Sequence, residues 1–191
     1  MLIVLAVGLC LSFNLIAHQS PQKRALTVQF EKDSISMLLF YSLPDTKNTQ
    51  SLMLRYDSNH DGKIDPVEGN KLGKVLLPAA LQHLTFEVIG ESPGAKEPSL
   101  KFNYTKEGAL EMMVLMEFEL KPLKKDHTRK LKITMADDHH AIETAVQLQS
   151  MSPLMLSTQE PPTPGSFENQ SPILKLTHHN QITTTLVHAS K

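Results

Sequence analysis

The sequence predicts a mainly β fold with an α-helical insertion, arranged as an antiparallel β-sandwich-like domain over residues 24–150. Two observations predict it. Apolar and polar side chains alternate along several segments, most regularly over 110–120, where every second residue is apolar. The stretch 46–77 lacks this alternation and carries helix start and stop signals instead. We therefore expect two helices inserted between the second and third strands.

The N-terminal residues 1–17 carry no charged side chain and are followed by polar residues and by Lys23 and Arg24. This pattern is typical of a secretory signal peptide, so we expect a secreted or periplasmic protein. An uncleaved N-terminal membrane anchor is the alternative, although a helix of this length spans only about 25 Å of a hydrocarbon core of roughly 30 Å. After cleavage we expect no stable membrane insertion. Cys10 is the only cysteine, so the processed chain has no disulfide.

The charge pattern limits the classes of partner. The formal net charge is −1, and charges of both signs are interspersed, which argues against nucleic acid or an anionic membrane as the partner. Nine methionines and no tryptophan predict an aliphatic, methionine-rich core. We expect a monomer that binds an unknown protein partner.

The domain begins with two predicted strands. Residues 25–30 alternate between apolar and polar side chains, and 35–41 continue the same period after a short turn. The two segments are predicted to form a hairpin. Leu38 and Phe40 add apolar side chains to the second face, so we expect partial burial of the second strand on both sides.

Two helices are predicted next. Pro44 ends the strand pattern, and Asp45 or Thr46 can cap a helix over 49–56. The second helix is predicted over about 66–77.

One proline and two glycines affect that second helix. Pro78 is expected to end it, because proline lacks the N–H that continues a helix. Gly69 and Gly73 each lower its stability by roughly 1 kcal/mol relative to alanine.

The remaining strands are predicted over 84–89, 100–104, 110–120, 130–135 and 142–148. Lysines alternate along 130–135 and glutamates along 110–120, so we expect these two strands to lie side by side. Each resulting cross-strand charge pair contributes roughly 0.2 to 1 kcal/mol.

The C-terminal part changes in composition. Residues 151–172 are rich in Ser, Pro, Gln and Glu and are predicted to form an extended linker. The final segment, 173–191, has weak strand patterns over 173–176 and 182–187. These either complete the sheet or stay mobile.

The most specific chemical signal lies between the two predicted helices, in residues 57–68. Oxygen-bearing side chains occupy loop positions one, three, five, nine and twelve, glycine occupies position six, and an aliphatic residue occupies position eight. Ca²⁺ takes six to eight oxygen ligands, and ligands spaced two residues apart let a short loop wrap around it. The segment resembles the calcium loop of an EF-hand.

The resemblance implies Ca²⁺ as the cofactor and a specific set of ligands. The four carboxylates of the loop would repel one another without a cation, which favours a bound divalent ion. Ca²⁺ is preferred over Mg²⁺, because Mg²⁺ does not readily accept a bidentate carboxylate. The alternative is an acidic surface turn without a metal. The implied ligands are the side chains of Asp57, Asn59 and Asp61, the backbone carbonyl of Lys63, Asp65 directly or through water, and both oxygens of Glu68.

EF-hands usually occur in pairs, but no second calcium loop is visible in the sequence. We expect the backbone of Ile64, at loop position eight, to pair with a strand of the same domain or with a second copy of the chain. An unpaired loop is expected to bind Ca²⁺ with a dissociation constant of roughly 10⁻⁴ to 10⁻³ M. The loop is thus predicted to be a structural clip rather than a switch.

Calcium binding in a structural or interaction module is the first functional hypothesis. The alternative is a periplasmic accessory of a metal-ion transporter, because the order of elements is similar to that of bacterial periplasmic transport-associated proteins with one EF-hand. In that case His139 and His140, or His178 and His179, would bind a transition metal. A lesser alternative is an enzyme with a calcium-stabilised fold, although no catalytic motif is visible in the sequence.

Overall fold

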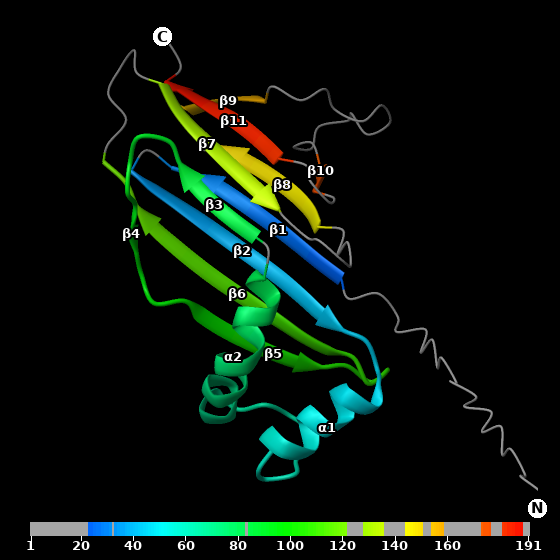
Figure 1. The fold of residues 1–191 in the computed structure, drawn as a ribbon. Helices are drawn as coiled ribbons and strands as arrows, with labels where there is room; N and C mark the ends of the chain where they lie inside the picture. Colours follow the sequence, from blue (N-terminus) through cyan, green and yellow to red (C-terminus); the bar gives the residue numbers. More distant parts are fainter. Residues whose placement is uncertain are drawn as a thin grey trace, which may run out of the picture.

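The computed structural model describes residues 23–31, 33–82, 84–121, 128–135, 144–150, 154–158, 173–176 and 181–188, so the predicted signal segment lies outside the described residues. A mainly β fold, with two helices between the second and third strands, is confirmed (Figure 1). The elements in chain order are β1 (Lys23–Phe30), β2 (Ser34–Leu43), α1 (Lys47–Tyr56), α2 (Pro66–Leu81), β3 (Leu84–Val88), β4 (Gly94–Ala95), β5 (Ser99–Tyr104), β6 (Leu110–Glu119), β7 (Thr128–Met135), β8 (Thr144–Ser150), β9 (Leu154–Thr158), β10 (Ile173–Leu176) and β11 (Gln181–His188).

The larger sheet has seven strands in the order β10-β8-β1-β2-β6-β4, and β5 also pairs with β6. The prediction of purely antiparallel strands is wrong at one pairing, because β1 and β8 are parallel, with Leu26 opposite Val146. β2 already occupies one edge of β1 as its hairpin partner. The free edge accepts β8 in the parallel direction because a long stretch of chain separates the two strands, as parallel pairing requires.

The smaller sheet has four antiparallel strands in the order β3-β7-β11-β9. The predicted pairing of the lysine-bearing strand β7 with β6 is therefore wrong. In the register of β7 and β3, Lys132 lies opposite Glu87. A strand of alternating lysines suits any acidic neighbour, so its charges alone do not select the partner strand.

The C-terminal strands join both sheets. β10 pairs with β8, and β11 pairs with β7 and β9, so the alternative in which residues 173–191 complete the sheets is confirmed for the described strands. β9 falls inside the stretch 151–172, for which a linker is predicted. It lies on the apolar run that precedes the proline-rich part of this stretch.

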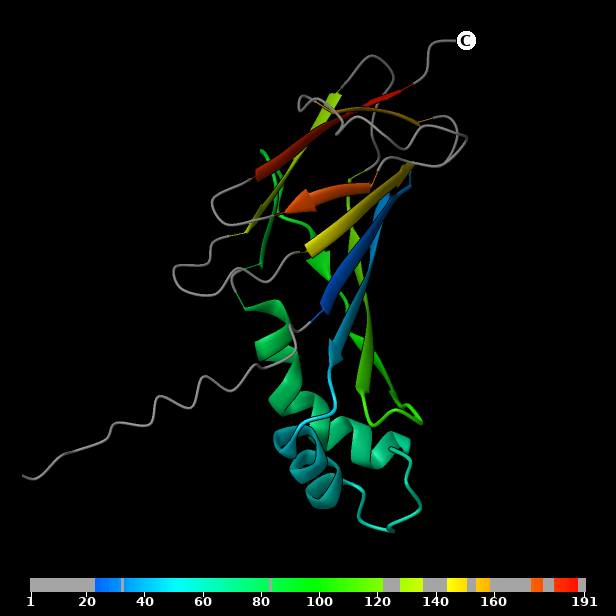
Figure 2. The same ribbon diagram turned by 90° about the vertical axis from the view of Figure 1, so that its right-hand side faces the viewer.

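The core lies on one face of the seven-stranded sheet. Figure 2 shows that α2 and the four-stranded sheet lie on this same side. Phe86 of β3 stacks on Phe118 of β6 with ring centroids 5.2 Å apart, which connects the two sheets. The prediction of an aliphatic core is confirmed, and the described residues contribute three buried methionines to it, Met37, Met53 and Met112. Its largest fully buried side chains are Leu26, Phe30, Ile35, Met37, Leu39, Leu72, Leu110, Met112 and Leu148.

The N-terminus of α1 agrees with one of the two predicted caps. The Thr46 hydroxyl accepts a hydrogen bond from the Thr49 N–H at 3.2 Å. The prediction that Pro78 ends α2 is wrong, because the helix continues through Pro78 to Leu81. Pro78 is exposed, so water can reach the backbone carbonyl that it leaves without a helical donor.

The end of α2 is held by a buried cation. Arg24 of β1 is only 3% exposed and donates hydrogen bonds to the carbonyls of Ala80 and Gln82, both at 3.0 Å. Its Nε also donates to the Thr144 hydroxyl at 2.6 Å. Arg24 therefore satisfies helix-end carbonyls and joins α2 to β1 and β8.

Gly69 and Gly73 allow α2 to lie close to β5. A Cβ on Gly69 would lie 3.2 Å from the Phe102 ring, and a Cβ on Gly73 would contact the side chain of Leu100. The two glycines lower the helix propensity of α2, but the absence of a Cβ at each of them lets the helix pack closely on β5. No helix among the described residues is both long and apolar enough to cross a membrane.

Candidate metal site

The loop between α1 and α2 is fixed at both ends by aspartates. Asp57 is the C-cap of α1, and its N–H donates to the Met53 carbonyl at 2.9 Å. Asp65 is the N-cap of α2, and its Oδ1 accepts the N–H groups of Val67 and Glu68 at 2.7 and 2.9 Å. The helices therefore set the positions at which the loop begins and ends (Figure 1).

The first half of the loop wraps around the Asp57 carboxylate, which is nearly buried. Asp57 Oδ1 accepts the Asp61 N–H at 3.2 Å, and Oδ2 accepts the Gly62 N–H at 2.9 Å. The chain turns here through left-handed backbone, with φ of +59° at His60 and +75° at Gly62. Glycine adopts this conformation without a steric penalty, which accounts for Gly62 at the sixth loop position.

Glu68 joins the two ends of the loop. It is 2% exposed, and its Oε1 accepts both the N–H and the hydroxyl of Ser58 at 2.7 Å each. Its Oε2 accepts the Asp65 N–H at 3.1 Å, which completes a capping box at the start of α2. The Ser58 hydroxyl and then the Asp65 N–H lower the pKa of Glu68 to about 2, so this carboxyl is ionised at neutral pH.

The middle of the loop is exposed. Asn59 Oδ1 accepts the Asp61 N–H at 3.0 Å, and Asp61 Oδ1 accepts the Lys63 N–H at 2.8 Å. Asn59 Nδ2 donates to Asp61 Oδ2 at 3.3 Å. The polar side chains at these positions thus bind the backbone and side chains of their own loop.

The predicted ligands fit Ca²⁺ in chemical type and in acceptor capacity. Asp57, Asn59, Asp61, Asp65 and Glu68 offer only oxygen as a metal ligand, as a hard cation requires. A carboxylate has about four lone-pair positions, so one that accepts two N–H groups can still accept a cation. The arrangement itself is not a formed metal site: in the described part of the chain, no three His, Cys, Asp or Glu side chains come together as a group that could hold a metal ion.

The backbone of Ile64 belongs to none of the strands in the described residues, so the expected pairing with a strand of the same domain is not found there. The alternative pairing with a second copy of the chain stays a prediction. The side chain of Ile64 is half-buried and packs against the core beside the position of Gly69. Ile64 thus anchors the loop through its side chain.

Sequence reasoning missed Ser58. This residue supplies both a backbone and a hydroxyl donor to Glu68, but loop position two has no required residue type in the EF-hand pattern. A shallow depression lies beside the loop, lined by Met53, Leu54 and Tyr104 together with loop residues. The spacing of the predicted ligands indicates neither the role of Ser58 nor the depression.

The four histidines that could bind a transition metal, His139, His140, His178 and His179, lie outside the described residues. Comparison of the sequence with models of known protein families and with curated protein sequences finds no match.

Proposed function

We propose that residues 57–68 bind one Ca²⁺ ion as an EF-hand-like loop, within a secreted or periplasmic, sandwich-like structural or interaction module. The observation that carries the proposal is the position of Glu68. This one carboxylate, from the first turn of α2, reaches both Ser58 at the start of the loop and Asp65 at its end. In an EF-hand loop, the glutamate at position twelve gives both carboxylate oxygens to the ion, so its side chain must lie next to the residues at the start and at the end of the loop.

The remaining ligands follow from the resemblance. Asp57, Asn59 and Asp61 each supply a side-chain oxygen, Lys63 supplies its carbonyl, and Asp65 acts directly or through water. Ca²⁺ would compete with the Ser58 hydroxyl for Glu68. A cation would also reduce the repulsion among the four carboxylates of the loop, which is the physical reason to prefer a bound ion over a metal-free acidic turn.

The position of the loop favours a structural role for the ion. The loop connects α1 to α2, and α2 packs on β5 and is held by Arg24 at its far end. An ion that fixes the start of α2 would therefore stabilise the packing of this helix on the sheet. At a Ca²⁺ concentration about ten times the dissociation constant, the gain in unfolding free energy is about 1.4 kcal/mol.

Titration calorimetry tests the proposal. Wild-type protein is expected to bind one Ca²⁺ with a dissociation constant of roughly 10⁻⁴ to 10⁻³ M. Glu68→Gln removes the charge and one oxygen ligand, so it should abolish the binding heat. Glu97→Gln, at an exposed glutamate outside the loop, is the matched control and should bind as wild type does. Absence of calcium binding by folded wild-type protein at millimolar concentrations contradicts the proposal.

A further inference from the structure

One oxygen of the Glu68 carboxylate has no position left for a metal ion. Each carboxylate oxygen has two lone-pair positions. Oε1 of Glu68 uses both of them, for the N–H and the hydroxyl of Ser58 at 2.7 Å each. Oε2 accepts the N–H of Asp65 at 3.1 Å and keeps a second position. A bidentate ion needs a position on each oxygen, so one of the two Ser58 donors must leave before such an ion binds.

The aspartates of the loop do not have this conflict. Asp57 and Asp61 accept one hydrogen bond on each of their two oxygens, so every oxygen keeps a position for an ion. Asp65 accepts both of its hydrogen bonds on Oδ1, which leaves Oδ2 for an ion or a water molecule. An aspartate that binds an ion through one oxygen therefore loses no hydrogen bond. Among the carboxylates of residues 57–68, this loss falls on Glu68.

The two donors of Ser58 differ in how easily they leave Glu68. The N–H belongs to the backbone directly after Asp57, which is fixed as the C-cap of α1 by its hydrogen bond to the Met53 carbonyl at 2.9 Å. The hydroxyl can turn about a single side-chain bond. Ser58 is exposed, so water can replace Glu68 as the acceptor of this hydroxyl. The hydroxyl is therefore the donor that an incoming ion displaces.

We propose that the Ser58 hydroxyl is an internal competitor of Ca²⁺, which holds Glu68 in the metal-free protein and thereby sets the affinity of the loop. This inference rests on the calcium binding proposed above. In the metal-free protein, the hydroxyl stabilises the Glu68 carboxylate between the two ends of the loop. Ca²⁺ must break this hydrogen bond to reach Oε1, so the bond lowers the affinity for Ca²⁺. Ser58 acts through Glu68 and is not itself a metal ligand.

The same hydrogen bond affects the choice between Ca²⁺ and Mg²⁺. Mg²⁺ requires near-ideal octahedral geometry and does not readily accept a bidentate carboxylate. Mg²⁺ would therefore use one oxygen of Glu68, and Oε2 already has a position for it. The Ser58 hydroxyl thus weakens the binding of Ca²⁺ without weakening that of Mg²⁺. Its removal should increase the preference of the loop for Ca²⁺.

Titration calorimetry of Ser58→Ala tests the competition. This variant keeps the N–H donor and removes the hydroxyl, so the dissociation constant for Ca²⁺ should fall by roughly fivefold, which corresponds to a net hydrogen bond of about 1 kcal/mol. The dissociation constant for Mg²⁺ should stay the same. Ser58→Thr keeps a hydroxyl and should bind both ions as wild type does. If wild type binds Ca²⁺ and Ser58→Ala binds it no more tightly, the competition is overturned. If neither protein binds Ca²⁺, calcium binding itself is overturned.

Melting temperatures in EDTA test the metal-free state. Ser58→Ala should melt at a lower temperature than wild type in EDTA, because Glu68 has lost a donor. Its melting temperature should rise more than that of wild type when Ca²⁺ is added. A residue that merely supports the loop would instead lower the melting temperature and the Ca²⁺ affinity together. Equal melting temperatures of the two proteins in EDTA would contradict the hold of Ser58 on Glu68.

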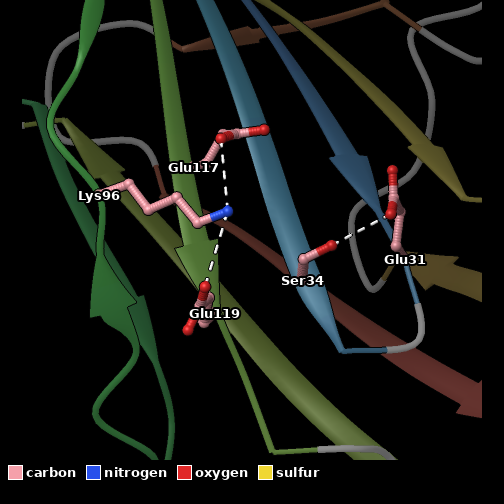
Figure 3. Close-up of polar contacts among 5 residues, drawn as sticks. All are labelled: Glu31, Ser34, Lys96, Glu117 and Glu119. Atoms are coloured by element: carbon pink, nitrogen blue, oxygen red, sulfur yellow. Dashed lines mark hydrogen bonds and ion pairs between the residues drawn. The ribbon is translucent and has the colours of Figure 1, made fainter.

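A second serine–glutamate pair provides the matched control. The hydroxyl of Ser34, the first residue of β2, donates to Oε2 of Glu31 at 3.1 Å, outside residues 57–68 (Figure 3). Ser34→Ala removes the same type of hydrogen bond, so it should also lower the melting temperature in EDTA. It should leave the dissociation constant for Ca²⁺ unchanged. An equal gain in Ca²⁺ affinity from Ser34→Ala and Ser58→Ala would show that the gain does not come from the release of Glu68.

Discussion

Arg24 shows how a single residue joins elements that are distant in sequence. Its guanidinium group binds two carbonyls at the end of α2 and the hydroxyl of Thr144, all from a buried position. Arginine can serve three acceptors in fixed directions, whereas lysine has a single compact ammonium group. The shape of this side chain therefore matters as much as its charge.

We expect Arg24→Lys to lower the free energy of unfolding by about 2 to 3 kcal/mol, because a buried cation would remain with fewer hydrogen bonds. Arg55→Lys is the matched control. Arg55 is exposed, so its substitution should change stability by less than about 0.5 kcal/mol. Urea unfolding of the three proteins measures the difference, and equal effects of the two substitutions would show that Arg24 does not hold α2.

Tyr41 predicts how stability changes at high pH. Burial raises the pKa of its phenol, and the positive charge of Arg24 partly opposes this rise. Above the unfolded pKa of about 10, the unfolded chain releases the proton while the folded chain keeps it. The unfolding free energy should therefore fall as pH rises above about 10, and it should fall less in Tyr41→Phe. Denaturant unfolding between pH 9 and 11 measures this, and parallel curves for both proteins would rule out a contribution from Tyr41.

At the scale of elements, α2 is determined by its contacts more than by its local sequence. Pro78 and two glycines predict a short, weak helix, yet the helix continues to Leu81. Leu72, Leu76 and Ala80 all lie on its buried side, and this apolar stripe runs past Pro78. Burial of the stripe, together with Arg24, compensates for the proline in a way that local signals do not reveal.

Gly73 and Leu100 should be energetically coupled. Gly73→Ala gains helix propensity of about 1 kcal/mol, but its Cβ must displace the Leu100 side chain. We expect no net gain in wild-type protein and a gain of about 1 kcal/mol in the Leu100→Ala background. Asn70→Ala, at an exposed position of the same helix, should have the same effect in both backgrounds. Thermal unfolding of the single and double variants measures this coupling. Additive effects of the substitutions at Gly73 and Leu100 would contradict close packing between these residues.

At the scale of the whole molecule, the sequence predicts the strands better than their partners. Alternation of apolar residues is a local property, so β1, β2 and β6 could be predicted directly. Pairing is not local: β7 pairs with β3 instead of β6, and β8 lies parallel to β1. The side chains that decide such choices are far apart in the chain.

The candidate site was predictable to a similar degree. The spacing of Asp57, Gly62 and Glu68 identifies the loop, because each position in a tight turn around a cation has its own requirement. Ser58 could not be predicted, since its role depends on the folded position of Glu68. The sequence therefore proposes a set of ligands, which stays a prediction, whereas the hydrogen bonds among these side chains follow from the fold.

The most direct measurement of the central proposal is the melting temperature of the folded chain with excess Ca²⁺ and with excess EDTA. A resident ion at residues 57–68 predicts a higher melting temperature with Ca²⁺, a smaller effect of Mg²⁺, and loss of the difference in Glu68→Gln. Identical melting temperatures of wild-type protein with Ca²⁺ and with EDTA would contradict calcium binding as a structural clip.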